Sequence, residues 1–213
     1  MIINYLQRDN RLDLYTMKRL FLLLALVGMI ATSCEDSGIE EPSAICADNE
    51  IKYTTKYGYP IELNKEEGFG GTLMSHTYEG EYGVLAFDND VKCIPVGAFK
   101  DCDTITSIIL PESLESIKSY AFNNCSALTS ITIPDSVTTI GDYAFWDCDS
   151  LTSVYCKATT PPSLGYNVFD YNHSSRKIYV PAESVQAYRR AGGWMVYAFD
   201  IVGYDFNNGV VVE

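Results

Sequence analysis

Hydrophobic and polar residues recur along the central part of the chain with a period of 23 residues. Residues 105–127 read ITSIILPESLESIKSYAFNNCSA, and residues 128–150 read LTSITIPDSVTTIGDYAFWDCDS. Four apolar positions keep this interval from one copy to the next: Phe99, Phe122 and Phe145; Cys102, Cys125 and Cys148; Ala98, Ala121 and Ala144; and Ile108, Ile131 and Val154. A fixed period of this length is typical of a solenoid, in which each unit buries its apolar side against its neighbours.

The second copy indicates which elements one repeat forms. Residues 130–133 alternate between polar and apolar side chains, which predicts a half-buried strand with Ile131 and Ile133 facing inward. Val137 and Ile140 form a second short apolar pair. These positions supply a core only when neighbouring repeats stack.

The remainder of the repeat predicts a turn and a short helical segment. Gly141 permits the turn, because glycine tolerates backbone angles that other residues avoid. Residues 142–145 predict a helical turn that buries Ala144 and Phe145. Strands and helical turns together predict an α/β solenoid, with the repeats over residues 91–158.

A solenoid with so few units must cover both of its apolar ends. Residues 50–90 predict a β-rich N-terminal cap, with strands at 51–55, 72–78 and 84–87 and a hairpin connection at 79–83. Residues 159–213 predict an irregular final repeat and a C-terminal cap. The C-terminal cap has a strand at 177–180 and a helix at 181–191, which Gly192 and Gly193 stop.

The spacing of the cysteines also follows from the repeat. Equivalent positions on stacked coils lie ~4.7–4.9 Å apart with parallel side chains. A disulfide needs Cβ atoms about 3.5–4.5 Å apart with converging vectors, and three thiols in a row cannot surround a tetrahedral zinc ion. We therefore expect Cys102, Cys125, Cys148 and Cys156 to be buried free thiols, whereas a pair between Cys46 and Cys93 stays open.

The amino-terminal region has the parts of an export signal. Lys18 and Arg19 precede an apolar run of about 11 residues, too short for the roughly 20 that span a bilayer, and small residues lead to Cys34. The segment resembles a bacterial lipoprotein signal, which implies lipidation of Cys34; a simple secretory signal is the alternative. We expect translation to begin at Met17, with residues 1–16 as an upstream extension, 17–33 as the signal peptide and 34–49 as an acidic tether.

The pattern L-T-S-I-x-I-P-x-S-V-x-x-I-G-x-x-A-F-x-x-C in residues 128–148 resembles the BspA-type leucine-rich repeats of bacterial surface proteins. The resemblance implies a short right-handed leucine-rich repeat solenoid. Acidic residues just after Cys34 also resemble the surface-export signal of some Gram-negative anaerobes. Together they imply an outer-membrane lipoprotein that is anchored by its lipid and exposed on the cell surface.

Charge and candidate chemistry narrow the function further. The net charge of −13 argues against nucleic acid as a partner, because phosphate binding requires clustered lysine and arginine. The only histidines, His76 and His173, have no nucleophile motif nearby. We therefore expect neither an enzyme nor a bound cofactor. Acidic residues along one edge could attract calcium weakly: Asp101, Asp103, Asp147 and Asp149.

The outward strand positions are the main candidate for a binding surface. They form a column of small residues beside a column of larger ones: Ser107, Ser130 and Ser153, then Ile109, Thr132 and Tyr155. Tyr143 and Trp146, in the predicted helical turn, form a second candidate. Strand propensity alone also explains threonine and tyrosine at such positions.

Two classes of function fit these features. The first is a monomeric, non-catalytic adhesion protein that binds a host or other cell-surface protein. The second is a glycan-binding accessory lipoprotein in nutrient capture, with Tyr155 and Trp146 as sugar platforms.

Overall fold

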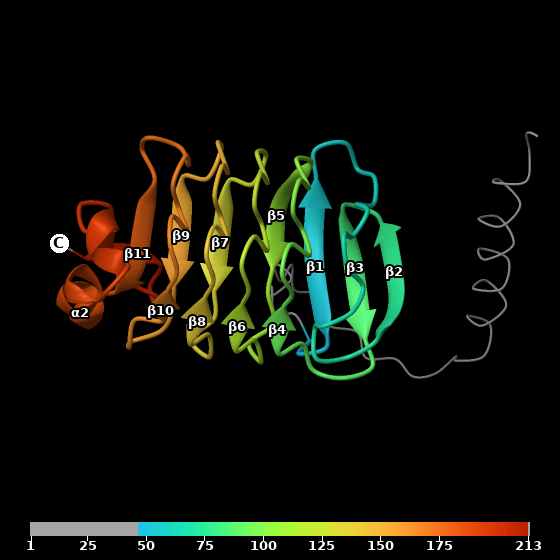
Figure 1. Ribbon diagram of the computed structural model, residues 1–213, viewed down its shortest axis with the longest axis horizontal. Helices are drawn as coiled ribbons and strands as arrows, with labels where there is room; N and C mark the ends of the chain where they lie inside the picture. Colours follow the sequence, from blue (N-terminus) through green and yellow to red (C-terminus); the bar gives the residue numbers. More distant parts are fainter. Residues whose placement is uncertain (1–46, 213) are drawn as a thin grey trace, which may run out of the picture. The chain divides into compact units, whose positions relative to one another are not determined.

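The computed structural model describes residues 47–212 (Figure 1). Four strands precede the first full repeat, and two lie within it: β1 (Glu50–Thr55), β2 (Leu73–Glu79), β3 (Tyr82–Phe87) and β4 (Cys93–Ile94), then β5 (Ile105–Ile109) and β6 (Ser116–Ile117). The remaining elements are β7 (Ser130–Ile133), β8 (Thr139–Ile140), β9 (Ser153–Cys156), β10 (Ser163–Leu164), β11 (Lys177–Pro181), η2 (Ala182–Ser184), α2 (Val185–Arg190), η3 (Trp194–Tyr197), β12 (Ile201–Asp205) and β13 (Val210–Val212).

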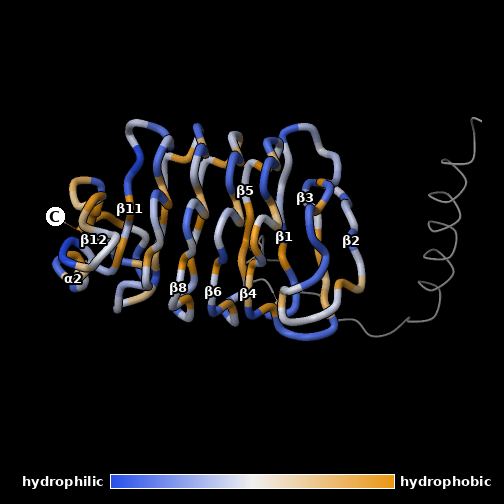
Figure 2. The backbone as a smooth tube through the Cα atoms, in the orientation of Figure 1, coloured by the Kyte–Doolittle hydropathy of each residue, from blue (hydrophilic) through white to orange (hydrophobic). Residues whose placement is uncertain are grey.

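The repeats build two sheets in which strands from successive repeats pair in parallel. One sheet has the order β10-β8-β6-β4, and its strands are in register with Ile94 beside Ile117 and Ile117 beside Ile140. In the other sheet β7, β9 and β11 are parallel, with Ile131 beside Val154. Successive 23-residue repeats therefore stack side by side, and hydrophobic stretches recur from coil to coil (Figure 2).

The turns that connect the two sheets form a third ladder of hydrogen bonds. The amide of Phe99 donates to the carbonyl of Ala121 at 2.8 Å, and the amide of Phe122 donates to the carbonyl of Ala144 at the same distance. Buried backbone groups need such partners, so the ladder lets the turns pack against one another without a helix or a strand.

The predicted helical turn at residues 142–145 is wrong. Tyr143 and Asp147 have left-handed backbone angles, with φ of 57° and 61°. The amide of Tyr143 donates to the carbonyl of Tyr166 on the next coil at 2.9 Å, whereas a helix would direct it back along its own segment. Ala144 and Phe145 are fully buried, as predicted. The repeats thus consist of strands and turns, and the helical elements among the described residues all follow β11.

The N-terminal part forms a four-stranded sheet of order β2-β3-β1-β5, with antiparallel pairs. The strands predicted at 51–55, 72–78 and 84–87 are confirmed as β1, β2 and β3. Tyr53 of β1 lies opposite Ile108 of β5, so the cap sheet continues directly into the first repeat strand.

The C-terminal elements cover the last coil with aromatic side chains. The indole nitrogen of Trp194 donates to the carbonyl of Pro162 at 2.7 Å, and the hydroxyl of Tyr188 donates to the carbonyl of Ala158 at 2.8 Å. Both side chains are fully buried. The strand predicted at 177–180 is confirmed as β11, and the helix predicted at 181–191 is confirmed as η2 followed by α2.

A ladder of phenylalanine rings runs through the core of the stack. Phe99, Phe122 and Phe145 stack with centroids 5.1 Å apart and rings inclined by 1° and 5°. Phe169 continues the ladder at 5.5 Å. Each ring thus packs on the equivalent ring of the next coil, and the 24-residue interval from Phe145 to Phe169 preserves this contact.

The repeat cysteines lie beside this ladder as buried free thiols, which confirms the prediction for Cys102, Cys125, Cys148 and Cys156. The thiol of Cys125 donates to the carbonyl of Phe99 at 3.1 Å. Burial raises the pKa of the Cys102 and Cys148 thiols to about 12. These thiols therefore act as small apolar side chains.

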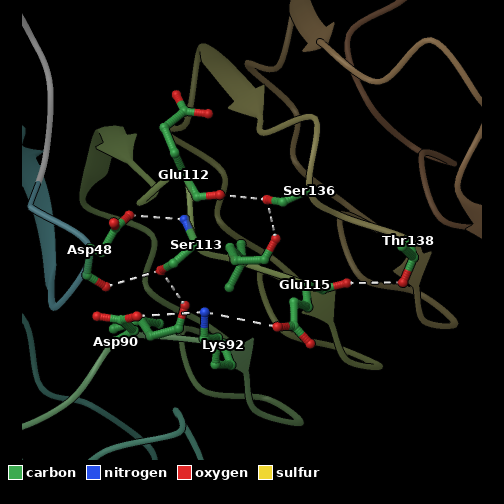
Figure 3. Close-up of polar contacts among 10 residues, drawn as sticks. Asp48, Asp90, Lys92, Glu112, Ser113, Glu115, Ser136 and Thr138 are labelled. Carbon is green, nitrogen blue, oxygen red and sulfur yellow. Dashed lines mark hydrogen bonds and ion pairs between the residues drawn. The ribbon is translucent and has the colours of Figure 1, made fainter.

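Hydroxyl groups tie neighbouring coils together along the edge of the β4-β6-β8 sheet (Figure 3). The Ser136 hydroxyl lies 2.6 Å from the carbonyls of Glu112 and Leu114. One coil earlier, the Ser113 hydroxyl lies 3.1 Å from the carbonyl of Asp48. The carboxylate of Asp48 also accepts the amide of Ser113 at 3.0 Å, so Asp48 extends the same contact into the cap.

Several predictions concern residues outside the described part of the chain. These are the start at Met17, the signal peptide at 17–33, the lipidated Cys34, most of the tether, and Cys46 with its open pairing to Cys93. Across residues 47–212, every helix is too short or too polar to span a membrane.

Candidate functional site

The predicted strand-face residues lie on one outward face of the parallel strands. Ser130 is in register with Ser153, and Thr132 is in register with Tyr155. Thr132 is exposed, and the other three are partly buried. Their inward neighbours Ile131, Ile133, Val154 and Cys156 are buried, which confirms the predicted alternation of the two faces.

At β5 the same face is lined by a different neighbour. Ser107 lies opposite Thr54 of β1, and Ile109 lies opposite Lys52. The hydroxyls of Ser107 and Thr54 are 2.8 Å apart. Ile109 is the one large apolar side chain among these four residues, so this end of the face is the less favourable place for a partner.

The C-terminal end of the face carries a group of aromatic side chains, which we call the strand-face aromatic cluster: Tyr155, Tyr179, Tyr204 and Phe206. Tyr155 and Tyr179 stack with centroids 4.7 Å apart and an inclination of 16°. The Tyr204 ring lies 5.3 Å from Tyr155 and 5.4 Å from Tyr179. Phe206 lies 5.0 Å from Tyr204, so the four rings form one continuous surface.

Of these four residues the sequence identified only Tyr155. Tyr179 could have been found from the sequence, because it follows Tyr155 by 24 residues, the same interval that separates Phe145 from Phe169. Tyr204 and Phe206 lie beyond the repeats, on β12 and just after it. No periodic signal points to them.

A groove with a volume of about 520 Å³ borders the strand-face aromatic cluster. Tyr204 and Phe206 line it. Its other lining residues follow β7 and β9 or come from β11, η2, β12, β13 and the β12–β13 connection: Asp135, Lys157, Thr159, Pro181, Ala182, Glu183, Asp205, Asn207 and Val212. Hydrogen bonds from Asn208 and Asn207 lower the pKa of Asp205. Lys157 forms an ion pair with Glu112 at 2.6 Å. The groove thus combines two aromatic walls with carboxylates.

Tyr143 and Trp146 belong to another part of the coil, the turn between β8 and β9. Tyr143 stacks on Tyr120 with centroids 5.1 Å apart, and Trp146 packs edge-on against Tyr171 at 5.2 Å. The structure therefore places the predicted residues on two surfaces, one on the strands and one on the turns.

The two histidines make local contacts in their own segments. The His76 ring lies 2.5 Å from the Tyr53 hydroxyl, and burial lowers its pKa while Glu66 offsets part of that shift. The His173 ring lies 2.8 Å from the Ser175 hydroxyl. Neither arrangement places a nucleophile beside a base that a third group orients, as nucleophilic catalysis requires.

The acidic residues considered for calcium are spread along the coil edge. The carboxylate of Asp101 accepts the side-chain amide of Asn124 at 2.9 Å. In the part of the chain that the structure describes, no three side chains among histidine, cysteine, aspartate and glutamate converge as a metal site.

A comparison with protein families relates these repeats to a known type. The family model of the BspA type leucine rich repeat region, in six copies, matches residues 82–191. The match includes β3 at its start and α2 at its end, so it extends into the segments that we assigned to the two caps. None of the curated proteins that were compared matches the chain.

Proposed function

The chain belongs to the BspA-type leucine-rich repeat family, and on this basis we propose that it is a non-catalytic surface lipoprotein that binds another protein. Repeats of this family are protein-binding or adhesion modules. The partner is a host or other cell-surface protein, and it docks on the outward face of β7, β9 and β11. The strand-face aromatic cluster is the observation that carries the proposal.

Tyrosine rings at the centre of a contact surface are typical anchors of protein interfaces. The cluster offers three tyrosine rings and the ring of Phe206 beside a groove of about 520 Å³. A protein interface around such anchors has a buried centre and a polar rim that forms hydrogen bonds. The groove supplies a recess for this centre, and the carboxylates of Asp135, Glu183 and Asp205 supply the rim.

The second candidate function is glycan binding, which the same tyrosines favour because sugars stack on aromatic faces. The geometry makes it the weaker candidate. The 4.7 Å separation of Tyr155 and Tyr179 equals the spacing of adjacent strands. Each ring therefore turns one face to its neighbour. A face that another ring covers is not available for a sugar to stack on.

The location of the protein is part of the proposal. We place it in the outer membrane, anchored through acyl chains on Cys34, with the acidic tether leading to the repeats on the cell surface. One acyl chain gives only reversible membrane binding, so stable anchoring requires more than one.

The test is a panel of host-matrix proteins and a glycan array, both probed with the full chain. Once a partner is found, Tyr155→Ala/Tyr179→Ala should weaken its binding about 30-fold or more, as expected for truncated anchor residues worth about 2 kcal/mol. Tyr82→Ala is the matched control, since Tyr82 is half exposed on β3, away from the cluster.

Equal affinities for the cluster variant and the control would contradict the proposal. Binding to the glycan array alone, with loss in the cluster variant, would establish the second candidate instead. Circular dichroism of each variant separates lost binding from lost structure.

A further inference from the structure

A second aromatic surface follows the turns rather than the strands. Five side chains form it, and we call it the turn-edge aromatic strip: Tyr120, Tyr143, Trp146, Tyr166 and Tyr171. Tyr120 follows β6, Tyr143 and Trp146 follow β8, and the last two follow β10. The strip thus crosses three successive coils.

Two ring pairs and two backbone hydrogen bonds connect these residues. Tyr120 and Tyr143 stack with centroids 5.1 Å apart and an inclination of 10°. The amide of Tyr143 donates to the carbonyl of Tyr166 at 2.9 Å, and the amide of Trp146 donates to the carbonyl of Tyr143 at 3.3 Å. Trp146 packs edge-on against Tyr171. The backbone hydrogen bonds therefore place the two ring pairs and Tyr166 on neighbouring segments of adjacent coils.

Two members of the strip are highly exposed. The exposed fraction is 78% for Tyr166 and 70% for Tyr171. Tyr171 also has a left-handed backbone, with φ of 57°, which is unfavourable for a bulky residue. Neither the core nor the backbone thus requires a tyrosine at these positions, whereas tyrosine and tryptophan are favoured at protein interfaces.

The charged side chains in the two later turns of the strip are acidic, whereas Lys118 lies two residues before Tyr120 at the other end of the strip. The two turns at residues 141–150 and 165–175 contain no lysine or arginine, and they contain four carboxylates: Asp142, Asp147, Asp149 and Asp170. The carboxylate of Asp142 accepts the amide of Tyr166 at 2.8 Å, which holds it next to the strip. Arg176, which follows the second turn, is bound to Asp200 at 2.5 Å.

Aromatic rings beside carboxylates complement arginine and lysine, because a cation is attracted to the ring and paired by the acid. We propose that the turn-edge aromatic strip binds a basic, extended segment of a partner protein. Its arginine and lysine side chains lie against Tyr166 and Tyr171 and pair with the neighbouring aspartates. Three coils span roughly 10 Å, about the length of three extended residues, so such a segment runs along the stack.

The experiment measures the binding of a fluorescent nona-arginine peptide to the full chain at 150 mM salt, with a neutral glycine–serine peptide as reference. Tyr166→Ala/Tyr171→Ala should raise the Kd about 4- to 25-fold, since each exposed cation–ring contact contributes about 2- to 5-fold. Tyr57→Ala/Tyr59→Ala is the matched control, because these tyrosines are 63% and 72% exposed elsewhere. Both double variants keep the net charge of −13.

A second pair of variants tests the carboxylates. Asp147→Asn/Asp149→Asn should weaken nona-arginine more than Glu79→Gln/Glu81→Gln, although each pair removes two negative charges. Asparagine tolerates the left-handed backbone of Asp147. Tyr166→Phe/Tyr171→Phe keeps the rings and should retain the wild-type Kd.

Three results would overturn the proposal: no binding of nona-arginine by the wild type, equal Kd values for the two tyrosine double variants, or equal Kd values for the two charge variants. Equal Kd values for the two charge variants would show that nona-arginine is attracted by the total negative charge of the protein and not by the strip. The strand-face groove also combines aromatic rings with carboxylates, so a greater loss of nona-arginine binding in Tyr155→Ala/Tyr179→Ala than in Tyr166→Ala/Tyr171→Ala would likewise count against the proposal. The strand-face function is tested with a different partner, so the two proposals succeed or fail independently.

Discussion

At the scale of single residues, His76 shows how the cap reacts to pH. Its ring lies 2.5 Å from the Tyr53 hydroxyl, and burial lowers its pKa, with Glu66 acting in the opposite direction. The folded state therefore binds a proton at His76 less readily than the unfolded chain, whose histidines titrate near pH 6.5. Its contribution to stability is complete above about pH 6.5 and is lost as the pH falls toward the lowered folded-state pKa.

We expect the free energy of unfolding to fall more between pH 7.5 and pH 5.5 in the wild type than in His76→Gln. Urea denaturation at the two pH values measures this. His173→Gln is the control, because His173 is exposed, and it should follow the wild type. An identical fall in His76→Gln and the wild type would show that His76 is not the responsible group.

Residue-level features differ in how far the sequence could predict them. The inward Ile131, Val154 and Cys148 were predicted because burial follows directly from period and alternation. The left-handed angles of Tyr120 and Tyr143 were not, because tyrosine has no local preference for them. Hydrogen bonds to the next coil hold these angles, and such bonds have no signal in a single repeat.

At the scale of elements, the turns determine how closely two coils approach. Gly141 was expected to permit a turn through its backbone freedom. It is not among the residues with left-handed angles. Instead, a Cβ atom on Gly141 would lie 2.4 Å from the backbone nitrogen of Ser119 on the preceding coil. Its small size, rather than its flexibility, is what the stack requires.

Gly141→Ala should therefore lower the free energy of unfolding by about 1–3 kcal/mol, since the clash is with backbone that must shift. The matched change is Gly192→Ala, where a Cβ would meet no atom within 4 Å. It should be neutral or stabilising by up to about 1 kcal/mol. Thermal or urea denaturation of the two variants distinguishes them, and equal stabilities would mean that the coils can separate at no cost.

The element types were predictable where the pattern was strong. The strands at 130–133 and 177–180 were predicted within one residue of their bounds. The segment at 142–145 was assigned to a helical turn that buries Ala144 and Phe145. A helix and a turn can both bury these two residues. The segment forms a turn because the Tyr143 amide donates to a carbonyl on the next coil and not to one in its own segment.

At the scale of the whole described domain, the repeats and the C-terminal cap share one core. Phe169 stacks on Phe145 at 5.5 Å and also lies 6.0 Å from Trp194 of the cap. Because the same ring contacts both parts, the cap and the repeats should unfold together. The two tryptophans report on both parts, since Trp146 lies in a repeat and Trp194 in the cap.

Single-tryptophan variants test this. In Trp146→Phe the fluorescence of Trp194 should change over the same urea range as the circular dichroism of that variant. The same agreement should hold for Trp146 in Trp194→Phe. Because fluorescence and circular dichroism are compared in the same variant, any effect of the substitution on stability shifts both signals equally. A cap signal that changes at lower urea than the circular dichroism would show that the cap unfolds separately.

The function-bearing surfaces were only partly predictable at this scale. Tyr155 and Tyr143 were identified because they stand at periodic positions. Tyr204 and Phe206 join the strand-face aromatic cluster through the path of the chain after the last repeat. The sequence pattern ends there, and only the folded chain brings them to Tyr155.

The hydrogen bonds between coils make the two ends of the stack chemically different. In the turns the amides donate toward the C-terminal end, as from Phe99 to the carbonyl of Ala121. The amides of residues that flank the short strands donate the opposite way, as from Gly141 to the carbonyl of Ile117. In the turns the N-terminal end therefore presents carbonyls and the C-terminal end presents amides, and beside the short strands the order is reversed.

Each cap matches only its own end. The N-terminal cap donates the Asn64 amide to the carbonyl of Ala98 in the turn and accepts the Cys93 amide through the carbonyl of Phe69. The C-terminal cap does the converse: the Tyr197 hydroxyl accepts the Phe169 amide, and Trp194 donates to the carbonyl of Pro162. The stack thus has a polarity, and an array of such repeats can change length only by gaining or losing whole coils between its two fixed ends.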